Sequence, residues 1–210
     1  MSKIFYTVVV FVVVTIFSTT TVYGTKETFA PMAGTPIEYI SLYSADCLVN
    51  DREDEEKTVV KMYEWVPLDE DLMSYIYTTC EEMGIDSAVF LGLIDLETGG
   101  TFNPNLISDT DDHGICQINR RYFTDHCSTA GIDLDTFDPY DPYQSVYVSL
   151  SLLDALYNRY GNLYQGNDLT TYVLSCYNRG ETGVKNMINR GDGHETLYSR
   201  IVLERAEKYR

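Results

Sequence analysis

The acidic side chain of Glu97 lies in a stretch that is otherwise apolar. On a helix, Glu97 stands three and four residues after Ile94 and Leu93, so its carboxyl group projects from the same face as theirs. Gly99 and Gly100 follow and leave space in front of it. Desolvation raises the pKa of such a carboxyl group and keeps a proton on it near neutral pH, as general acid catalysis at a glycosidic oxygen requires. The alternative is a buried structural glutamate that is satisfied by backbone donors or by a base.

Three blocks of sequence follow one another in a fixed order. They are residues 97–105 (ETGGTFNPN), 114–119 (GICQIN) and 177–180 (YNRG). These blocks resemble the soluble lytic transglycosylase (SLT) family of the lysozyme-like superfamily, which carries ESGFNP, GLMQI and YNAG in this order. The resemblance extends from about Val66 to the C-terminus. Outside the blocks it includes residues 141–142 and 198–200.

The resemblance implies an activity, a substrate and a set of site residues. Glu97 corresponds to the family's sole catalytic acid, which protonates the oxygen between N-acetylmuramic acid and N-acetylglucosamine in peptidoglycan strands. The same carboxylate then removes the proton of the muramoyl C6 hydroxyl, and a 1,6-anhydro ring closes without an activated water. The substrate's own N-acetyl oxygen can stabilise the charge at C1, so a second carboxylate is dispensable. The substrate-binding residues that the resemblance implies are Gln117, Tyr177, Asn178, Ser108 and Thr98.

Each of these residues taken alone also has a plainer explanation. Gln117 fits a surface amide, Ser108 a turn hydroxyl, and residues 177–180 the end of a helix with ordinary Asn and Gly punctuation. Their occurrence together with Glu97 favours the functional interpretation.

The chain departs from the family pattern at several positions. The stretch before Phe102 is two residues longer, Cys116 replaces a residue that is usually apolar, and Thr98 replaces a serine but keeps the hydroxyl. Arg179 replaces the small alanine of YNAG, so a long cation can reach the groove or the solvent.

Two alternative functions remain open from the sequence. Asp109, Asp111 and Asp112 lie 12 to 15 residues after Glu97, and one of them could hold a water about 6.5–9.5 Å from it. The enzyme would then be an inverting hydrolase of the same bond, as goose-type lysozymes are understood to be. These aspartates equally fit a solvated acidic loop. The other alternative is a non-catalytic glycan-binding domain that keeps the lysozyme-like shape.

The spacing of apolar residues predicts the elements that position this site. It indicates an all-α fold, or nearly so, in a single lysozyme-like domain over residues 66–210. No run of residues alternates convincingly as a strand does. The predicted helices run from Pro67 to Gly84, from Asp86 to Gly99, from Asp141 to Gly161, from about Leu169 to Asn178, and from His194 to Lys208.

The charge balance of the chain excludes one class of partner. Asp and Glu total 32 against 15 Lys and Arg, and the net charge is −17. This is the wrong sign for holding phosphate backbones by counterion release, so no nucleic-acid partner is expected. Hydrophobic residues make up 44% of the chain, which is enough for a folded core.

The first 65 residues are expected to lie outside the compact domain. Lys3 followed by the apolar run 4–17 predicts a signal peptide over residues 1–24. The alternative is an uncleaved membrane tether through residues 4–22. Both place the rest of the chain outside the cytoplasm, as a secreted or outer-face protein. Residues 25–65, partly acidic, are predicted to be a spacer.

The cysteines define neither a disulfide framework nor a metal site. The chain has five cysteines, an odd number that leaves at least one thiol unpaired. His113 with Cys116, and His126 with Cys127, make a zinc site thinkable, but a second well-spaced pair is lacking. No metal and no other cofactor is expected.

Overall fold

The structure, a computed structural model, describes residues 60–210. The predicted signal peptide or tether, and the spacer up to residue 59, lie outside the described residues. Within residues 60–210, no helix combines the length and the apolar character needed to cross a membrane.

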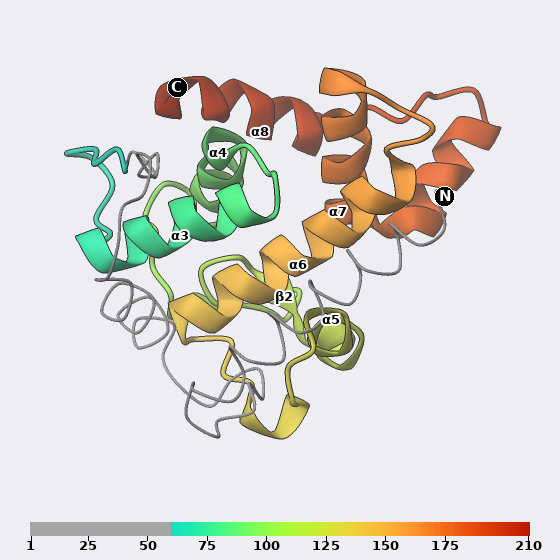
Figure 1. Ribbon diagram of the computed structural model, residues 1–210. Helices are drawn as coiled ribbons and strands as arrows, with labels where there is room; N and C mark the ends of the chain where they lie inside the picture. The colour runs from blue at the N-terminus through green and yellow to red at the C-terminus, as the bar shows by residue number, and fades with distance from the viewer. Residues whose placement is uncertain (1–59) are drawn as a thin grey trace, which may run out of the picture. The chain divides into compact units, whose positions relative to one another are not determined.

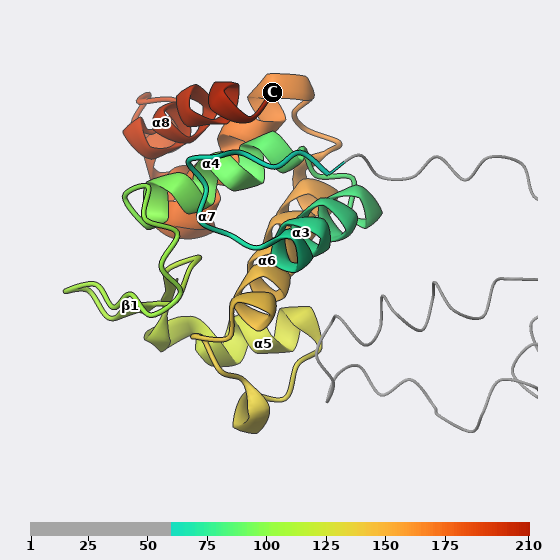
Figure 2. The ribbon, with the colours of Figure 1, turned by 90° about the vertical axis from the view of Figure 1, so that its left-hand side faces the viewer.

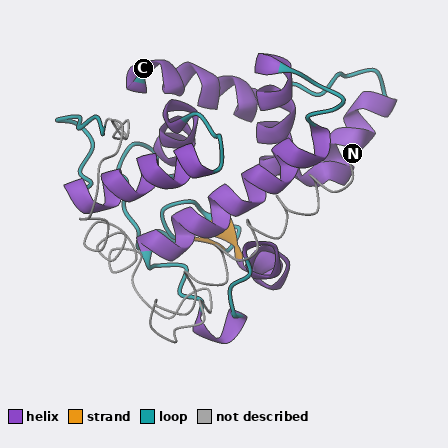
Figure 3. Ribbon diagram, viewed as in Figure 1, coloured by secondary structure: helices purple, strands orange, loops and turns teal. Residues whose placement is uncertain are grey.

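The described chain is built almost entirely of helices, which confirms the predicted all-α lysozyme-like fold. Figure 3 shows its strands as one small hairpin. The helices are α3 (Glu70–Glu82), α4 (Ser87–Glu97), α5 (Phe123–Ala130), α6 (Pro142–Tyr160), α7 (Gly166–Asn189) and α8 (Leu197–Ala206). The strands are β1 (Asp112–His113) and β2 (Ile118–Asn119), and short 3-10 turns are η1 (Arg120–Tyr122), η2 (Leu134–Thr136) and η3 (Glu207–Tyr209).

Aspartate side chains begin three of the helices. Asp86 and Asp141 cap α4 and α6 at the predicted positions, by accepting the backbone N–H groups of Ala88 and Tyr143 at 2.9 Å each. The first predicted helix begins later than expected. Asp69 caps α3, so Pro67 precedes the helix and does not form its first turn.

The last two helices differ from their predicted bounds. The segment 177–180 was expected to end a helix, yet α7 continues beyond it to Asn189. The chain bends at Gly180, whose φ of 71° and ψ of 156° are not helical, and it then resumes the helix. Helix α8 begins after Thr196 instead of at His194, because Thr196 and Ser199 form a reciprocal capping box there.

Helix α5 and the hairpin were not predicted. Helix α5 has eight residues, of which only Cys127 and Ala130 are buried, so it shows no apolar stripe. Each strand has two residues, paired Asp112 with Asn119 and His113 with Ile118, which is too short for an alternating pattern.

Helix α4 lies at the centre of the core. Its residues 88–95 are all buried, and α8 packs along it. Figures 1 and 2 both show α8 on one side of α4 and α5 on the far side, with α6 in between. The contact between α4 and α8 is close at Gly92, where a Cβ atom would lie 2.7 Å from the carbonyl oxygen of Val202. This crossing sets the C-terminal helix directly against the helix that ends in Glu97.

Candidate active site

Glu97 is the last residue of α4 and lines a groove of about 840 Å³. Leu93 and Ile94, one turn earlier on the same helix, are fully buried. The groove is also lined by residues of the hairpin, of α5, of α6 and of α7 around its bend. The carboxyl group therefore leaves the core at the point where the helix meets the groove.

The environment of Glu97 keeps a substantial fraction of its carboxyl group protonated near neutral pH. Burial raises its pKa from 4.5 to about 7. The Tyr198 hydroxyl donates a hydrogen bond of 2.5 Å to Glu97 Oε1 and opposes this rise, while the negative charge of Asp112 adds to it. Burial prevails, so the group can both give a proton and take one back near pH 7.

Two tyrosines flank the carboxyl group. Tyr177 on α7 and Tyr198 on α8 stack with ring centroids 6.5 Å apart and an interplanar angle of 18°. The Tyr177 hydroxyl donates to the carbonyl oxygen of Cys116 at 3.0 Å and to Ser149 Oγ at 3.2 Å. Burial raises the pKa of both phenols well above the usual range, so both remain hydrogen-bond donors.

Sequence reasoning missed Tyr198 as a site residue. In the sequence, Tyr198 stands out only as part of the resemblance over residues 198–200. Tyr198 could have been identified only from the packing of α4 against α8, which the spacing of apolar residues does not predict.

Gln117 and Asn178, predicted to bind substrate, line the same groove as Glu97. Gln117 Nε2 donates to the carbonyl oxygen of Gly114 at 2.8 Å, which fixes the orientation of the amide. Gly114 itself has a φ of 77°, and a Cβ atom there would lie 1.9 Å from the carbonyl oxygen of Pro139. Glycine is therefore required for the turn that presents Gln117.

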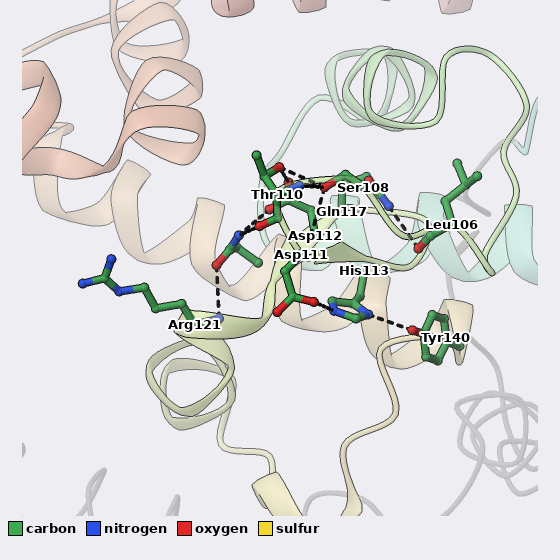
Figure 4. Close-up of polar contacts among 10 residues, drawn as sticks. Leu106, Ser108, Thr110, Asp111, Asp112, His113, Gln117, Arg121 and Tyr140 are labelled. Atoms are coloured by element: carbon green, nitrogen blue, oxygen red, sulfur yellow. Dashed lines mark hydrogen bonds and ion pairs between the residues drawn. The ribbon is translucent and has the colours of Figure 1, made fainter.

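Ser108 and Thr98, also predicted to bind substrate, are not among the described residues that line the groove. The Thr98 hydroxyl donates to the carbonyl oxygen of Ile94 at 2.7 Å and accepts from the backbone N–H of Phe102 at 3.0 Å. It therefore closes the end of α4. Ser108 Oγ donates to Asp112 Oδ2 at 2.6 Å, as Figure 4 shows. Their direct contact with substrate stays a prediction.

Asp112 is the member of the acidic loop that lines the groove with Glu97. Its carboxylate accepts hydrogen bonds from Ser108, from Thr110 and, at 2.8 Å, from Asn119 Nδ2. Burial alone would raise its pKa, but these donors outweigh burial and hold the pKa below its usual range. Asp112 is therefore ionised at neutral pH, while Glu97 is about half protonated.

The other two aspartates of the loop are exposed. Asp111 Oδ1 lies 2.7 Å from His113 Nε2, and His113 Nδ1 lies 2.7 Å from the hydroxyl of Tyr140 (Figure 4). Both ring nitrogens of His113 are thus engaged, one with Asp111 of the loop and the other with Tyr140 before α6.

The residues considered for zinc do not converge. In the part of the chain that the structure describes, no three His, Cys, Asp or Glu side chains are placed to hold a metal ion. Four cysteines in this part are buried free thiols: Cys80, Cys116, Cys127 and Cys176. Cys47 lies outside the described residues.

Comparison with known proteins agrees with the site. A family profile described as "Transglycosylase SLT domain" matches residues 74–198, which is more than half of the chain. No curated protein matches the sequence. The matched range begins in α3 and ends at Tyr198, so it contains Glu97, the hairpin and the bend of α7. The chain therefore belongs to the transglycosylase SLT family, whose lysozyme-like domains act on the glycan strands of peptidoglycan.

Proposed function

We propose that the protein is a lytic transglycosylase that cleaves the β-1,4 bond between N-acetylmuramic acid and N-acetylglucosamine and leaves 1,6-anhydromuramic ends. The observation that carries the proposal is the carboxyl group of Glu97, which lines the groove with a pKa of about 7. Such a group is suited to two proton transfers in opposite directions within one turnover.

In the first step, Glu97 donates its proton to the bridging oxygen, and the bond from that oxygen to C1 of muramic acid breaks. The positive charge that develops at C1 is stabilised by the substrate's own N-acetyl oxygen, so no second carboxylate is required. In the second step, the Glu97 carboxylate takes the proton of the C6 hydroxyl while O6 bonds to C1. The carboxyl group is thereby restored, and no water is consumed.

Tyr198 and Tyr177 support this cycle from behind the carboxyl group. The Tyr198 hydroxyl donates to Glu97 in both protonation states. This hydrogen bond becomes stronger when Glu97 is a carboxylate, because the acceptor is then charged. Tyr177 stacks on Tyr198 and anchors the α7 side of the groove to the carbonyl oxygen of Cys116.

The test is mass spectrometry of purified peptidoglycan digested with the protein. Anhydromuramic products support the proposal, and products heavier by one water contradict it. Glu97→Gln should lower turnover by about a hundredfold to ten-thousandfold, because the amide gives no proton. Glu195→Gln, a charge-matched change at an exposed residue, should leave turnover unchanged.

A second candidate is an inverting hydrolase in which Asp112 activates a water. It is favoured by one observation: Asp112 is an ionised carboxylate on the same groove as Glu97. Under this alternative, Asp112→Asn abolishes turnover and the products take up ¹⁸O from labelled water. In a transglycosylase the products carry no label and Asp112→Asn keeps most of the turnover. Asp109→Asn, at an exposed position of the same loop, is the control in both cases.

The proposed place of action is outside the cytoplasm, where peptidoglycan lies. The predicted export segment over residues 1–24 supports this location. Export of the full chain, followed by N-terminal sequencing, tests it: a mature N-terminus near Thr25 supports cleavage, and a retained Met1 supports a tether.

A further inference from the structure

The arginines of residues 60–210 fall into two groups by their ion pairs. Most of them hold a carboxylate: the pairs are Arg159 with Glu181, Arg190 with Asp192, Arg200 with Glu195, Arg205 with Asp95, and Arg210 with Asp86. The others, Arg120, Arg121 and Arg179, pair with no carboxylate among the described residues. Acidic residues outnumber basic ones by 32 to 15 in this chain, so arginines that form no ion pair are unexpected.

The three unpaired arginines lie in the groove that contains Glu97 or in a hollow beside it. Arg179 lines the groove itself, next to Tyr177 and Asn178. Arg120 and Arg121 line an adjoining hollow of about 500 Å³. The hollow shares Thr110, Asn119 and Tyr122 with the groove, so the two form one continuous surface.

The acids of this surface form no ion pair with the three arginines, and most of them have other contacts. Glu181 holds Arg159, Asp111 holds His113, and Asp112 accepts from three donors of its own loop. Asp125 also lines the groove, where its charge acts on the neighbouring His126.

The Arg121 side chain is turned away from the carboxylate of Asp111, as Figure 4 shows. Its guanidinium carbon lies 5.8 Å from the centroid of the Tyr122 ring, which is a cation–π distance. The exposed Tyr122 ring thus carries a cation at the junction of groove and hollow.

A planar guanidinium without a partner is matched to a carboxylate, which it can bind through two parallel hydrogen bonds. Peptidoglycan strands carry carboxylates on the peptides that are attached to their muramic acid residues. We propose that Arg120, Arg121 and Arg179 bind these peptide carboxylates, so that the preferred substrate is a peptide-bearing strand. This proposal rests on the proposed function for the identity of the strand, and it concerns recognition and not bond cleavage.

Binding measurements test the proposal without turnover. In a Glu97→Gln background, the dissociation constant is measured for soluble strands whose peptides carry free carboxylates and for the same strands after amidation. Exposed ion pairs each contribute a few-fold in affinity, so we expect about fivefold to tenfold tighter binding of the free-carboxylate strands. Raising the salt concentration should reduce this preference, because exposed charges are screened.

Arginine variants assign the preference to residues. Arg120→Gln with Arg121→Gln should reduce the ratio of the two dissociation constants toward one, and Arg179→Gln should reduce it in part. Replacement of the same pair by lysine should retain only part of the preference, because the charge is kept but the two parallel hydrogen bonds are lost. Arg190→Gln removes an exposed, ion-paired arginine and should leave the ratio unchanged.

Several results would overturn the inference. One is equal affinity for the two kinds of strand; another is a loss in the glutamine variants that is the same for both. If Arg190→Gln lowered the ratio of the dissociation constants as much as the other variants do, the preference would depend only on the net charge of the protein. Displacement of the strands by a soluble poly(glycerol phosphate) at a lower concentration than by the free peptides would assign the arginines to phosphate instead. Failure of the proposed function can be distinguished from failure of this inference. If the wild-type protein never cleaves the strands but still binds the free-carboxylate strands more tightly, the proposed function is wrong and this inference holds.

Discussion

At the scale of single residues, Glu97 is an acid that the fold keeps from ionising. Burial holds its pKa at about 7 against its usual 4.5, and the Tyr198 hydroxyl offsets part of that effect. The consequence extends beyond catalysis, because a pKa that differs between the folded and unfolded states makes stability depend on pH.

Glu97→Gln should therefore stabilise the fold at alkaline pH. Below pH 4.5 the carboxyl group is protonated in both states, so it contributes no pH dependence. Between pH 4.5 and 7 the unfolded chain releases the proton and the folded chain retains it, so wild-type stability falls as the pH rises. The variant lacks this loss, and its advantage in unfolding free energy should grow by about 3 kcal/mol from pH 4 to pH 8. Urea unfolding at both pH values measures it, and an advantage that is the same at both would contradict the raised pKa.

Tyr198→Phe should move the alkaline limit of activity to higher pH. The hydroxyl stabilises the charged form of Glu97, so its removal raises the pKa of the acid further. A hydrogen bond to a charged group contributes about 1.5–3 kcal/mol, which corresponds to a shift of about one pH unit or more. The pH profile of kcat/KM measures the shift, and Tyr164→Phe is the control, since Tyr164 stacks on Tyr172 away from the groove. An unchanged alkaline limit would show that Tyr198 does not act on Glu97.

The sequence was sufficient to single out Glu97 but not its tyrosine partner. Glu97 is recognisable because it interrupts the apolar face of one helix, which is a local pattern. Tyr198 approaches it from a helix 101 residues later in the chain. Such a contact depends on how two helices cross, and the spacing of residues within either helix carries no information about that.

At the scale of elements, the crossing of α4 and α8 is what brings Tyr198 to Glu97. Gly92→Ala should separate the two helices, because the added Cβ would lie 2.7 Å from the carbonyl oxygen of Val202 and 2.8 Å from the backbone nitrogen of Ala206. Neither backbone atom can rotate away. Overpacking of this kind costs about 1–3 kcal/mol, which exceeds the gain in helix propensity of about 1 kcal/mol at most.

Urea unfolding and the pH profile together check the Gly92→Ala variant. We expect lower stability and an alkaline limit that moves in the same direction as in Tyr198→Phe. Gly183→Ala is the matched control in α7, where the new Cβ meets only the side chain of Arg179 at 3.2 Å. If Gly92→Ala is no less stable than this control, the close crossing is not required.

The elements that could be predicted are those whose ends are marked by capping residues. Asp86 and Asp141 predicted the starts of α4 and α6, because an N-cap can be recognised from residue type and position alone. The bend at Gly180 was predicted to be a helix end, since Asn178 and Gly180 are residue types that also end helices, and the residue pattern does not show that the helix resumes after them. The hairpin and α5 carry almost no apolar signal, so tertiary contacts alone define them.

At the scale of the whole molecule, the buried Asp95 joins α4 to the C-terminal segment. Its carboxylate accepts from Arg205 Nη1 at 2.6 Å, from Lys208 Nζ at 3.1 Å and from the Tyr209 hydroxyl at 2.9 Å. Burial would raise its pKa, but these donors and charges hold the pKa below its usual range. The Tyr63 hydroxyl in turn donates to the carbonyl oxygen of Tyr209 at 2.7 Å, so the segment before α3 is tied to the same point.

Arg205→Gln should destabilise the protein by about 3 kcal/mol, because it leaves the Asp95 carboxylate, whose side chain is 6% exposed, without its closest counter-ion. Lys208→Gln should cost less, since the lysine side chain is 56% exposed. Arg190→Gln, which breaks an exposed pair, should change stability by less than about 1 kcal/mol. Because the Asp95 pKa is lowered on folding, wild-type stability from this cluster should be lost as the pH falls below the usual aspartate range. Equal effects of Arg205→Gln and Arg190→Gln would show that Asp95 does not anchor the C-terminal segment.

The single hydrogen bond between Tyr198 and Glu97 also distinguishes the two oxygens of the carboxyl group. Since Oε1 accepts from the phenol, we expect the acidic hydrogen to reside on Oε2. A bridging sugar oxygen should then meet its proton donor at Oε2, because the Tyr198 hydroxyl already occupies Oε1. The phenol would thus decide which of the two chemically equal oxygens serves as the donor.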